Sequence, residues 1–317
     1  MSDAGLNWTA FEKIVKCRAE ALFPEAGRLF HGRSGGFPGL ENVTVDVFGP
    51  VVLIATYGEV AEPTIQTLAA ILNRAVGKGM WQGREDFCMV LQARQGPDVC
   101  WSALTGTAPQ TLWVKYLGLA FEVKIGQTQN VGLFPDMIQG HRLVAELAKG
   151  KRILNLFAYT CVFSVVAMNA GADSVVNVDL SKSSLARGRR NHLHNGLVTK
   201  DVKFLPHHVM KSLGAFRRWG PFDMVICDPP TYQAGSFKAV RDYPKLARRL
   251  GECLNPGADV IACLNAPHLD RAHLNEWFGG GGYRLLATLG RPEAYGENQP
   301  DRDLKIHHYR YSPGSGF

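Results

Sequence analysis

The stretch that most constrains the fold of this chain is residues 152–181, which read RILNLFAYTCVFSVVAMNAGADSVVNVDLS. An apolar run at 153–157 opens it and predicts a parallel strand that is buried on both faces. A small, polar turn follows at 158–161, and residues 163–170 predict a helix that stops at Gly171. Because a strand, a tight turn and a helix follow one another in this order, the stretch predicts half of a nucleotide-binding α/β unit.

A second apolar run, residues 174–178, ends on Asp179. The carboxylate stands about twenty residues past the first strand, where it can accept hydrogen bonds from both ribose hydroxyls of an adenosine. The stretch lacks the G-x-G-x-x-G fingerprint, which lets a helix N-terminus approach a pyrophosphate. S-adenosylmethionine contains adenosine but no pyrophosphate, so a site for it does not need those glycines. For this stretch alone, the alternative is a βαβ unit with a surface Asp and no ligand.

Composition limits what the whole chain can be. Its 317 residues, 46% of them hydrophobic and 20% charged, are typical of a globular protein large enough for two domains. We expect no membrane span and no secretory signal, since no apolar run is long enough and the first residues are not basic and then apolar. The seven cysteines are scattered and never form C-x-x-C, which predicts a reducing, cytoplasmic location without disulfides or a metal site. The formal charge of +7 favours a polyanionic partner such as nucleic acid.

Residues 1–126 predict a small α+β domain. Its expected elements are helices at 8–22 and 61–75, a hairpin of strands at 43–47 and 51–57, a strand at 87–93, and a hairpin within 112–125 that turns at Leu117-Gly118. Residues 29–39, LFHGRSGGFPG, predict a glycine-rich connection.

Residues 127–317 predict an α/β domain with a parallel sheet, because apolar strands alternate with helices. The expected strands are 152–157, 174–178, 202–205, 223–227, 258–264, 283–289 and 305–311, and the expected helices are 136–149, 162–170, 182–194, 207–217, 244–254 and 267–277. Ser181 is expected to cap the helix that follows it, and Pro244 to stand in the first turn of its helix. The last two strands, with few residues between them, predict an antiparallel hairpin at one edge of the sheet.

A second motif, MVICDPPTY at residues 224–232, places a carboxylate at the end of a buried strand. Ligands of open α/β sheets bind in the crevice outside such strand ends. Two prolines after Asp228 fix the backbone, so the turn can hold this carboxylate at a constant distance from a ligand. The rings of Tyr232 and Phe237 can offer a stacking face to an unstacked base. A plain strand-to-loop turn is the alternative.

Four motifs together resemble class I S-adenosylmethionine-dependent methyltransferases, and in particular the bacterial enzymes that methylate large-subunit ribosomal RNA. They are NLFAYT at 155–160, VDLS at 178–181, HNGL at 194–197 and CDPPTY at 227–232. GLFPDM at 132–137 is similar to the segment just before the methyltransferase domain of that family, and residues 28–40 are similar to its small central domain. The resemblance implies a seven-stranded, Rossmann-like sheet with an antiparallel last strand, S-adenosylmethionine as cofactor and ribosomal RNA as partner. The RNA-binding module that some relatives carry at the N-terminus is not expected in this chain.

The resemblance also implies site residues, position by position. Those implied to hold the cofactor are Phe134, Asp136, Arg142, Asn155, Phe157, Tyr159, Thr160, Asp179, Leu180, His208 and Asp228. Among them, Asp179 is implied to accept the ribose hydroxyls and Leu180 to flank the adenine. Asp228, Pro229 and Asn265 are implied to be catalytic, with the first two between the methyl group and the target base.

Three positions depart from the family pattern. Cys161 stands where Gly is usual, which adds a side chain at the tightest part of the turn. His208 replaces an acidic residue that often faces adenine, and Met137-Ile138 replace a polar-Arg pair that would bind the methionine carboxylate. The alternatives are therefore a degenerate, non-catalytic RNA-binding relative or a methyltransferase for another substrate. A dinucleotide-dependent oxidoreductase is disfavoured, because the phosphate-binding glycines are missing.

The target atom depends on whether a cysteine takes part. Carbon-5 of a pyrimidine becomes reactive only after a thiolate adds at carbon-6, and in the cytosine-methylating branch that cysteine stands where this chain has Asn265. Cys263 is expected on the same face but deeper, and Cys227 is expected in the core. Guanine N7 needs only positioning. The sequence therefore favours guanine N7 over cytosine carbon-5.

Basic residues follow the D-P-P-T-Y motif. Lys245, Arg248 and Arg249 are expected to share one helix face, and Lys238 and Arg241 to lie in the loop before that helix. Because this group begins at the mouth of the predicted active site, we predict that Lys238, Arg241 and Lys245 contact the RNA backbone. A solvated helix face is the alternative.

Overall fold

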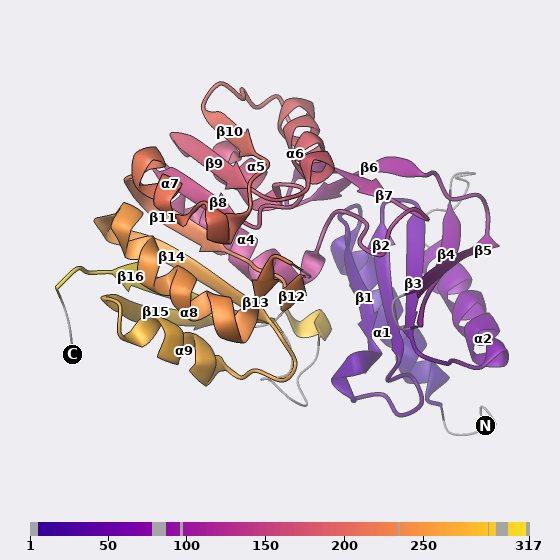
Figure 1. Cartoon of the computed structure of the whole chain (residues 1–317). Helices are drawn as coiled ribbons and strands as arrows, with labels where there is room; N and C mark the ends of the chain where they lie inside the picture. The colour runs from indigo at the N-terminus through magenta and orange to yellow at the C-terminus, as the bar shows by residue number, and fades with distance from the viewer. Residues whose placement is uncertain are drawn as a thin grey trace. The chain divides into compact units, whose positions relative to one another are not determined.

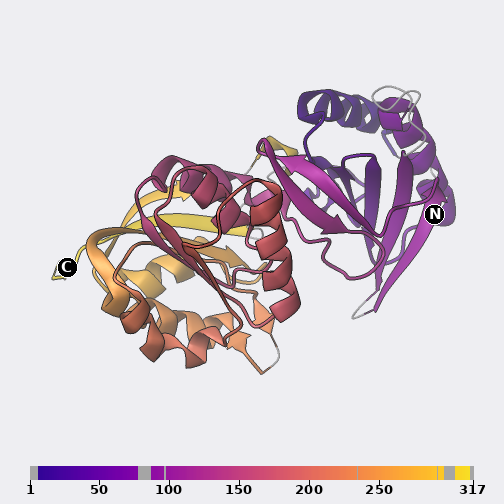
Figure 2. The same cartoon turned by 90° about the horizontal axis from the view of Figure 1, so that it is seen from above.

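A computed structural model describes residues 6–77, 87–95, 98–233, 235–290, 292–295 and 304–314. The chain divides into two compact units, each of which can be followed in Figures 1 and 2. Unit 1 comprises Met1–Asp136 with Pro292–Asn298, and unit 2 comprises Met137–Arg291 with Gln299–Phe317. The domain boundary after residue 126 stays a prediction from the sequence.

Unit 1 contains a five-stranded sheet among its described residues, in the order β1-β2-β3-β4-β5. The strands are β1 (Gly27–His31), β2 (Val43–Phe48), β3 (Val51–Tyr57), β4 (Cys88–Gln95) and β5 (Asp98–Thr105). β3 and β4 run parallel, and the other neighbours run antiparallel. The helices α1 (Trp8–Leu22) and α2 (Glu62–Leu72) pack on one face, where Phe11 and Leu68 share an apolar core with Val45 and Ile54.

Several predictions for unit 1 are confirmed, and two strands were not foreseen. The hairpin of β6 (Thr111–Tyr116) and β7 (Leu119–Lys124) turns at Leu117 and Gly118, whose φ angles of 52° and 73° fit a two-residue hairpin turn. The predicted glycine-rich connection at 29–39 is wrong at its beginning, because β1 continues to His31. β5 was not predicted; it pairs only with β4 and lies at an edge of the sheet, so its residues do not form a continuous apolar run.

Unit 2 contains a seven-stranded sheet among the residues that the structure describes, and this confirms the predicted fold class. The strand order is β10-β9-β8-β11-β14-β16-β15 (Figure 1). The strands are β8 (Arg152–Leu156), β9 (Ser174–Val178), β10 (Val202–Leu205), β11 (Phe222–Cys227), β14 (Leu254–Asn265), β15 (Tyr283–Leu289) and β16 (Leu304–Tyr311). The first five in this spatial order are parallel, whereas β16 is antiparallel to both of its neighbours.

Helices cover both faces of this sheet because the strand residues alternate between them. On one face, α4 (Ile138–Leu147) and α5 (Val162–Asn169) pack against Ile153 and Ile226, and α6 (Lys182–His194) lies beside α5. On the other face, α7 (Leu213–Trp219), α8 (Ala239–Leu250) and α9 (Arg271–Gly279) pack against Leu154 and Val260. Ser181 caps α6 as predicted, since its hydroxyl accepts from the N–H of Ser184 at 3.1 Å.

Three sequence predictions in unit 2 are corrected. α8 begins at Ala239, so Pro244 lies inside it and not in its first turn. The earlier start is fixed by Asp242, whose carboxylate accepts from the N–H of Lys238 at 2.9 Å. The expected helix 207–217 is instead a 3₁₀ turn at Val209–Lys211 followed by α7. The predicted antiparallel pairing of the last two strands at the sheet edge is confirmed by β15 and β16, but residues 290–303 lie between them, a longer connection than expected, and part of it belongs to unit 1.

A buried carboxylate joins three separate segments of unit 2. The side chain of Asp259, on β14, is 3% exposed and accepts hydrogen bonds from His308 Nε2 at 2.7 Å and from Lys151 Nζ. Arg310 Nη2 lies 3.0 Å from the same carboxylate. Burial opposes ionisation of Asp259, but these cationic and hydrogen-bonding partners outweigh it, and its pKa lies below the ordinary value for Asp.

We predict that Asp259→Ala lowers the free energy of unfolding by about 1.5–3 kcal/mol at pH 7, because the buried His308 ring and the partly exposed Lys151 and Arg310 lose their shared partner. The folded-state pKa is depressed, so the stabilisation is present above the unfolded-state value of about 3.9 and is lost as the pH falls through the folded-state value. Urea denaturation at pH 7 and at a series of lower pH values measures both effects. The exposed Asp201→Ala is the control, and equal stability of wild type and Asp259→Ala at pH 7 would contradict the assignment.

Candidate cofactor and active site

Polar side chains gather at one edge of the sheet in unit 2. Since parallel strands point the same way, the residues after β8, β9, β10, β11 and β14 all lie at the carboxyl edge. These residues include Tyr159, Asp179, His208, Asp228 and Asn265, one from each strand. Residues predicted from five separate segments of the sequence thus lie at one edge of the sheet.

The turn after β8 is held in an unusual backbone conformation. Three of its residues have positive φ angles although none is glycine: Phe157 at 58°, Tyr159 at 46° and Cys161 at 61°. Each such residue costs about 1–3 kcal/mol and persists only where the surroundings fix it. The turn is fixed in part by the N–H of Ala158, which donates to the carbonyl of Val178 at 3.1 Å. Strain of this kind is concentrated at ligand-binding sites, which makes this turn the first candidate.

Asp179 braces the turn from the neighbouring strand. Its Oδ2 accepts from the N–H of Tyr159 at 2.9 Å, and its Oδ1 accepts from the N–H of Ser181 at 2.8 Å. Burial raises the pKa of Asp179, and the two backbone hydrogen bonds oppose that rise only in part. Each carboxylate oxygen has a second lone pair, so the group can also accept from two ligand hydroxyls. Leu180 follows with its side chain 41% exposed, an apolar surface beside the carboxylate.

The side chain of Cys161 is accommodated by a glycine that the sequence did not single out. Cys161 is fully buried, and a Cβ built on Gly188 of α6 would lie 2.4 Å from its Sγ. Only glycine at position 188 therefore lets the helix approach the turn this closely. One helical turn later, Asn191 Nδ2 donates to the carbonyl of Thr160 at 3.0 Å. α6 thus fixes the turn from behind, and the departure at Cys161 is compatible with a formed site.

A buried chain of hydrogen bonds supports the same turn from below. Asn155 Nδ2 donates to Asn177 Oδ1 at 2.9 Å, and Asn177 Nδ2 donates to Ser164 Oγ at 3.0 Å. The Gly188 carbonyl can only accept, so His192 Nδ1–H donates to it at 2.8 Å, and Nε2 of the neutral ring then accepts from the Ser164 hydroxyl at 3.0 Å. This order requires a neutral His192, and burial lowers the pKa of His192 accordingly. Sequence reasoning missed Asn177, Ser164 and His192; their polar character within buried segments was the available signal.

The side-chain amide of Asn155 uses one of its two polar atoms in this hydrogen-bond chain. Its amide nitrogen is engaged by Asn177, whereas its buried Oδ1 has no hydrogen-bond partner in the structure as described. The cofactor contact implied for Asn155 stays a prediction, and Oδ1 is the atom that would make it.

The opposite wall of the site is the D-P-P turn after β11. Asp228 is partly exposed and Pro229 is buried. The Thr231 hydroxyl donates to the carbonyl of Asn265, which joins this turn to the end of β14. Tyr243 on α8 strengthens the same junction, since its hydroxyl lies within hydrogen-bond distance of the carbonyls of Cys227 and Cys263, at 3.1 and 3.0 Å. These three contacts fix the D-P-P turn against the ends of β11 and β14.

The two aromatic residues after the D-P-P turn have different roles. Tyr232 is 61% exposed, and Lys238 Nζ lies 5.6 Å from its ring centroid. Phe237 is 0% exposed and packs edge-on against Phe157 at 5.0 Å. The predicted base-stacking role of Phe237 is therefore wrong for this structure, because its ring belongs to the core under the turn. Tyr232 keeps a free face for a base.

The remaining cofactor-binding residues implied by the resemblance are not joined to the turn after β8 by the contacts described above. Phe134 and Asp136 belong to unit 1, whereas Arg142 is an exposed residue of α4 in unit 2. His208 is partly buried, and its buried Nδ1 has no hydrogen-bond partner within the described ranges. Met137 packs into the core, with its Sδ 3.9 Å from Cys263 Sγ. The roles implied for Phe134, Asp136, Arg142 and His208 stay predictions.

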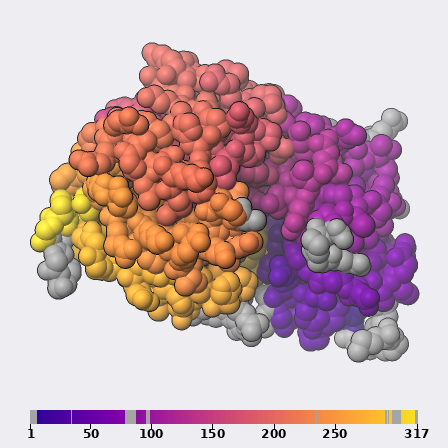
Figure 3. All heavy atoms as spheres, in the orientation of Figure 1, coloured from indigo at the N-terminus to yellow at the C-terminus, as the bar shows by residue number. Residues whose placement is uncertain are grey.

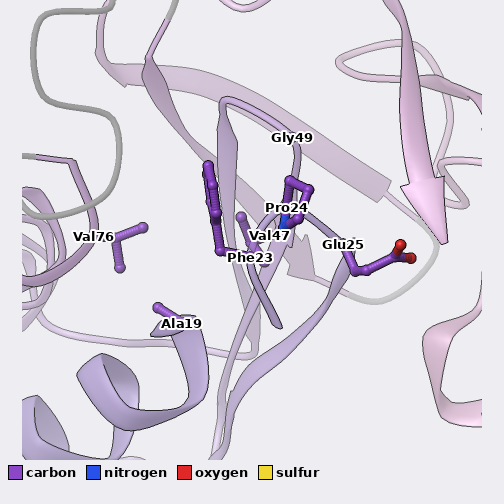
Figure 4. A pocket seen from close by; sticks show the side chains of 7 residues that line it. All are labelled: Ala19, Phe23, Pro24, Glu25, Val47, Gly49 and Val76. Carbon is purple, nitrogen blue, oxygen red and sulfur yellow. The ribbon is translucent and has the colours of Figure 1, made fainter. Parts of the chain in front are cut away.

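Other features of the described residues leave the strand ends as the main candidate. No group of three His, Cys, Asp or Glu side chains in the described ranges is arranged to hold a metal ion. None of the described helices is both long and apolar enough to cross a bilayer. A small hollow in unit 1, lined by Ala19, Phe23, Pro24, Glu25, Val47, Gly49 and Val76, contains none of the predicted site residues (Figure 4).

Comparison with known proteins connects this geometry to a family. The family model described as S-adenosylmethionine-dependent methyltransferase matches residues 27–310. A ribosomal RNA large subunit methyltransferase I from Photobacterium profundum is 29% identical over 74% of this chain and 59% of its own length. A ribosomal RNA large subunit methyltransferase from Deinococcus radiodurans is 27% identical over 85% of this chain and 68% of its own. The chain thus spans less than two thirds of the first of these relatives.

A solved structure resembles the chain over nearly its whole length. It is that of SMU.776, described as a candidate methyltransferase and complexed with SAH. The TM-score is 0.84 at 25% identity, and the match covers 98% of this chain and 83% of that one. The cofactor predicted from the sequence, S-adenosylmethionine, is confirmed by this family assignment.

We predict that Asp179→Ala weakens S-adenosylmethionine binding by about 1.5–3 kcal/mol, because a charge-assisted contact to the ribose is lost. Isothermal titration calorimetry with the cofactor and with its demethylated product measures the change. Asp173→Ala is a matched control, since Asp173 is an exposed residue directly before the amino end of β9, at the other end of the strand from Asp179. Wild-type affinity in Asp179→Ala, with unchanged circular dichroism, would remove Asp179 from the site.

Proposed function

The chain belongs to the S-adenosylmethionine-dependent methyltransferase family, and from that premise we propose that it methylates a base of large-subunit ribosomal RNA. The observation that carries this proposal is the pairing, at one sheet edge, of the Asp179-braced turn with the rigid D-P-P-T turn. The first can bind an adenosine, and the second can hold a base against it. The names of the curated relatives support ribosomal RNA as the substrate.

The described residues fit S-adenosylmethionine, which supplies a methyl group activated by its sulfonium. Asp179 would accept the ribose hydroxyls, and Leu180 would flank the adenine, with His208 nearby. The 157–160 turn and Asn155 Oδ1 would line the methionine side. We propose that Phe134, Asp136 and Arg142 close this pocket. Asp228 and Pro229 would then separate the cofactor from the target base, and Asn265 would contact the base from the end of β14.

Guanine N7 is the favoured target atom, because the cysteines near the described strand ends are buried thiols. Methylation at cytosine carbon-5 needs a cysteine that adds to carbon-6. Cys227 and Cys263 are both 0% exposed, and burial raises the pKa of each thiol above its ordinary value. The exposed side chain at the end of β14 is Asn265. Guanine N7 carries its own lone pair and needs only to be held in line with the methyl group.

The proposal predicts that labelled methyl groups from S-adenosylmethionine appear in large-subunit ribosomal RNA as 7-methylguanosine, measured by mass spectrometry of nuclease digests. Cys227→Ala and Cys263→Ala should both keep the wild-type rate within about tenfold, whereas loss of a true nucleophile would cost about 10⁴-fold or more. Abolished activity in a correctly folded cysteine variant, or a covalent complex with 5-fluorocytosine RNA, would favour cytosine carbon-5. No methyl transfer by wild type would favour a non-catalytic RNA-binding relative.

α8 offers a basic surface next to this site. Its first residue lies beside the D-P-P-T turn, because the N–H of Ala239 donates to the carbonyl of Thr231 at 3.1 Å. Lys238, Lys245 and Arg248 are exposed, and α8 lies on the face of unit 2 turned to the viewer in Figure 3 (orange). Arg241 is in the helix and not in a loop, as the sequence had suggested, and its guanidinium pairs with Asp242 at 2.6 Å. Arg241 is thus partly neutralised, and the lysines carry the proposal.

We predict that the double variant Lys238→Ala/Lys245→Ala weakens RNA binding and lowers the slope of log affinity against log salt by about 1.4, or 0.7 for each lost phosphate contact. Affinity for S-adenosylmethionine should not change. The matched control is Arg217→Ala/Arg218→Ala, which removes two exposed charges from the last turn of α7, next to the amino end of β11. A wild-type salt slope in the lysine variant would show that RNA does not cross α8.

A further inference from the structure

Unit 1 brings two arginines onto a single tyrosine ring. Tyr57 is the last residue of β3. Arg33, in the 3₁₀ turn Gly32–Ser34, has its Cζ 4.0 Å from the Tyr57 ring centroid. Arg94, on β4, has its Cζ 5.1 Å from the same centroid. The two guanidinium carbons are therefore no more than 9.1 Å apart. We call Arg33, Tyr57 and Arg94 the arginine–tyrosine cluster.

The position of Arg94 is fixed by a buried partner. Its Nε donates to Gln92 Oε1 at 2.7 Å, and its Nη2 donates to the carbonyl of Gln129 at 3.2 Å. Gln92 is fully buried, and its own Nε2 donates to the same Gln129 carbonyl at 2.9 Å. A guanidinium held in this way loses little conformational freedom when it binds a ligand.

The charge of the cluster is not neutralised by any carboxylate among the described residues. Neither Arg33 nor Arg94 forms an ion pair with any carboxylate in the described part of the chain. Arg28, on the same sheet, shows the contrast: its Nε and Nη2 contact both oxygens of Asp46, at 2.5 and 3.0 Å. That pair is nearly buried and electrically balanced. Two permanent positive charges that share one ring repel each other, and a polyanion would remove that cost.

We infer that the arginine–tyrosine cluster is a contact surface for single-stranded RNA; this inference rests on the proposed function and names a second RNA surface, in unit 1. Guanidinium groups over an aromatic ring extend its flat surface, so a base can continue the stack while the N–H edges bind phosphate. An acidic peptide would use only the charged edges and would leave the flat faces without a partner. RNA is therefore the occupant that uses both features of the cluster.

The test uses the full-length protein and a fragment of large-subunit ribosomal RNA. Arg33→Ala/Arg94→Ala should lower the salt slope of RNA binding by about 1.4, whereas Lys13→Ala/Lys16→Ala, which removes two exposed charges from α1, should leave it unchanged. Arg33→Lys should keep most of the slope and still weaken binding about fivefold or more, because charge is kept and stacking is lost. S-adenosylmethionine affinity and kcat at saturating RNA should stay at wild-type values in all of these variants. Thermal unfolding shows whether Arg94→Ala, at a partly buried position, keeps the wild-type stability. The single variant Arg33→Ala changes only an exposed side chain and tests the cluster without this risk to folding.

The outcomes separate the two proposals. If wild type methylates RNA and the arginine variants match its affinity and salt slope, the cluster is not an RNA surface. If RNA binding is unchanged in the variants but binding of a polyglutamate peptide is lost, the partner is an acidic protein and the inference is overturned. If wild type neither binds nor methylates ribosomal RNA, the proposed function fails, and the cluster inference fails with it.

Discussion

The structure of unit 2 depends most on the two hydrogen bonds that Asp179 accepts from the backbone of Tyr159 and Ser181. They connect the turn after β8 to the end of β9, and they oppose the strain of three non-glycine residues with positive φ. Burial raises the pKa of this carboxylate, so its ionised form is maintained at a cost to stability. A group that is costly in the free protein and has lone pairs left to accept hydrogen bonds is suited to gain from a ligand with two hydroxyls. Shaping the turn and binding the ribose are therefore two tasks of one side chain.

The residues behind the turn explain how the strain persists. The chain of Asn155, Asn177, Ser164 and His192 is fully buried, and each of its links has a defined donor and acceptor. In a low-dielectric interior, a network of this kind favours one arrangement, because another would leave more buried polar groups unpaired than Asn155 Oδ1, which has no partner among the described residues. Gly188 completes the fit, since any side chain there would collide with Cys161. The Cys161 side chain in the turn thus occupies the space that a side chain at position 188 of α6 would need.

The parts of this fold that could be predicted are those in which burial leaves a simple pattern. Strands such as β8 and β9, covered on both faces, read as mostly apolar runs, each interrupted by one Asn, and Ser181 is a local cap. The parts that could not be predicted depend on contacts between distant residues. Phe237 looks like a surface aromatic in the sequence, and only its packing on Phe157 places it in the core. In the same way, nothing near Gly188 in the sequence shows that Cys161 lies against it, and the start of α8 depends on a side chain three residues inside the helix.

The same constraints indicate how such a site would accelerate methyl transfer. Cys161, Cys227 and Cys263 all lie near the strand ends, and burial raises the pKa of each thiol, which disfavours the thiolate that a covalent route would need. A target atom that carries its own lone pair needs only to be held in line with the methyl group of the cofactor. A rigid site provides this alignment, because it excludes other angles of approach. The D-P-P turn supplies that rigidity: its prolines restrict the backbone, Thr231 joins it to β14, and the Tyr243 hydroxyl bridges the carbonyls of the two strands. Under the proposed function, proximity and orientation set by backbone geometry would be the chief source of the rate enhancement, and the target base would be the one that the surrounding surface can present in line.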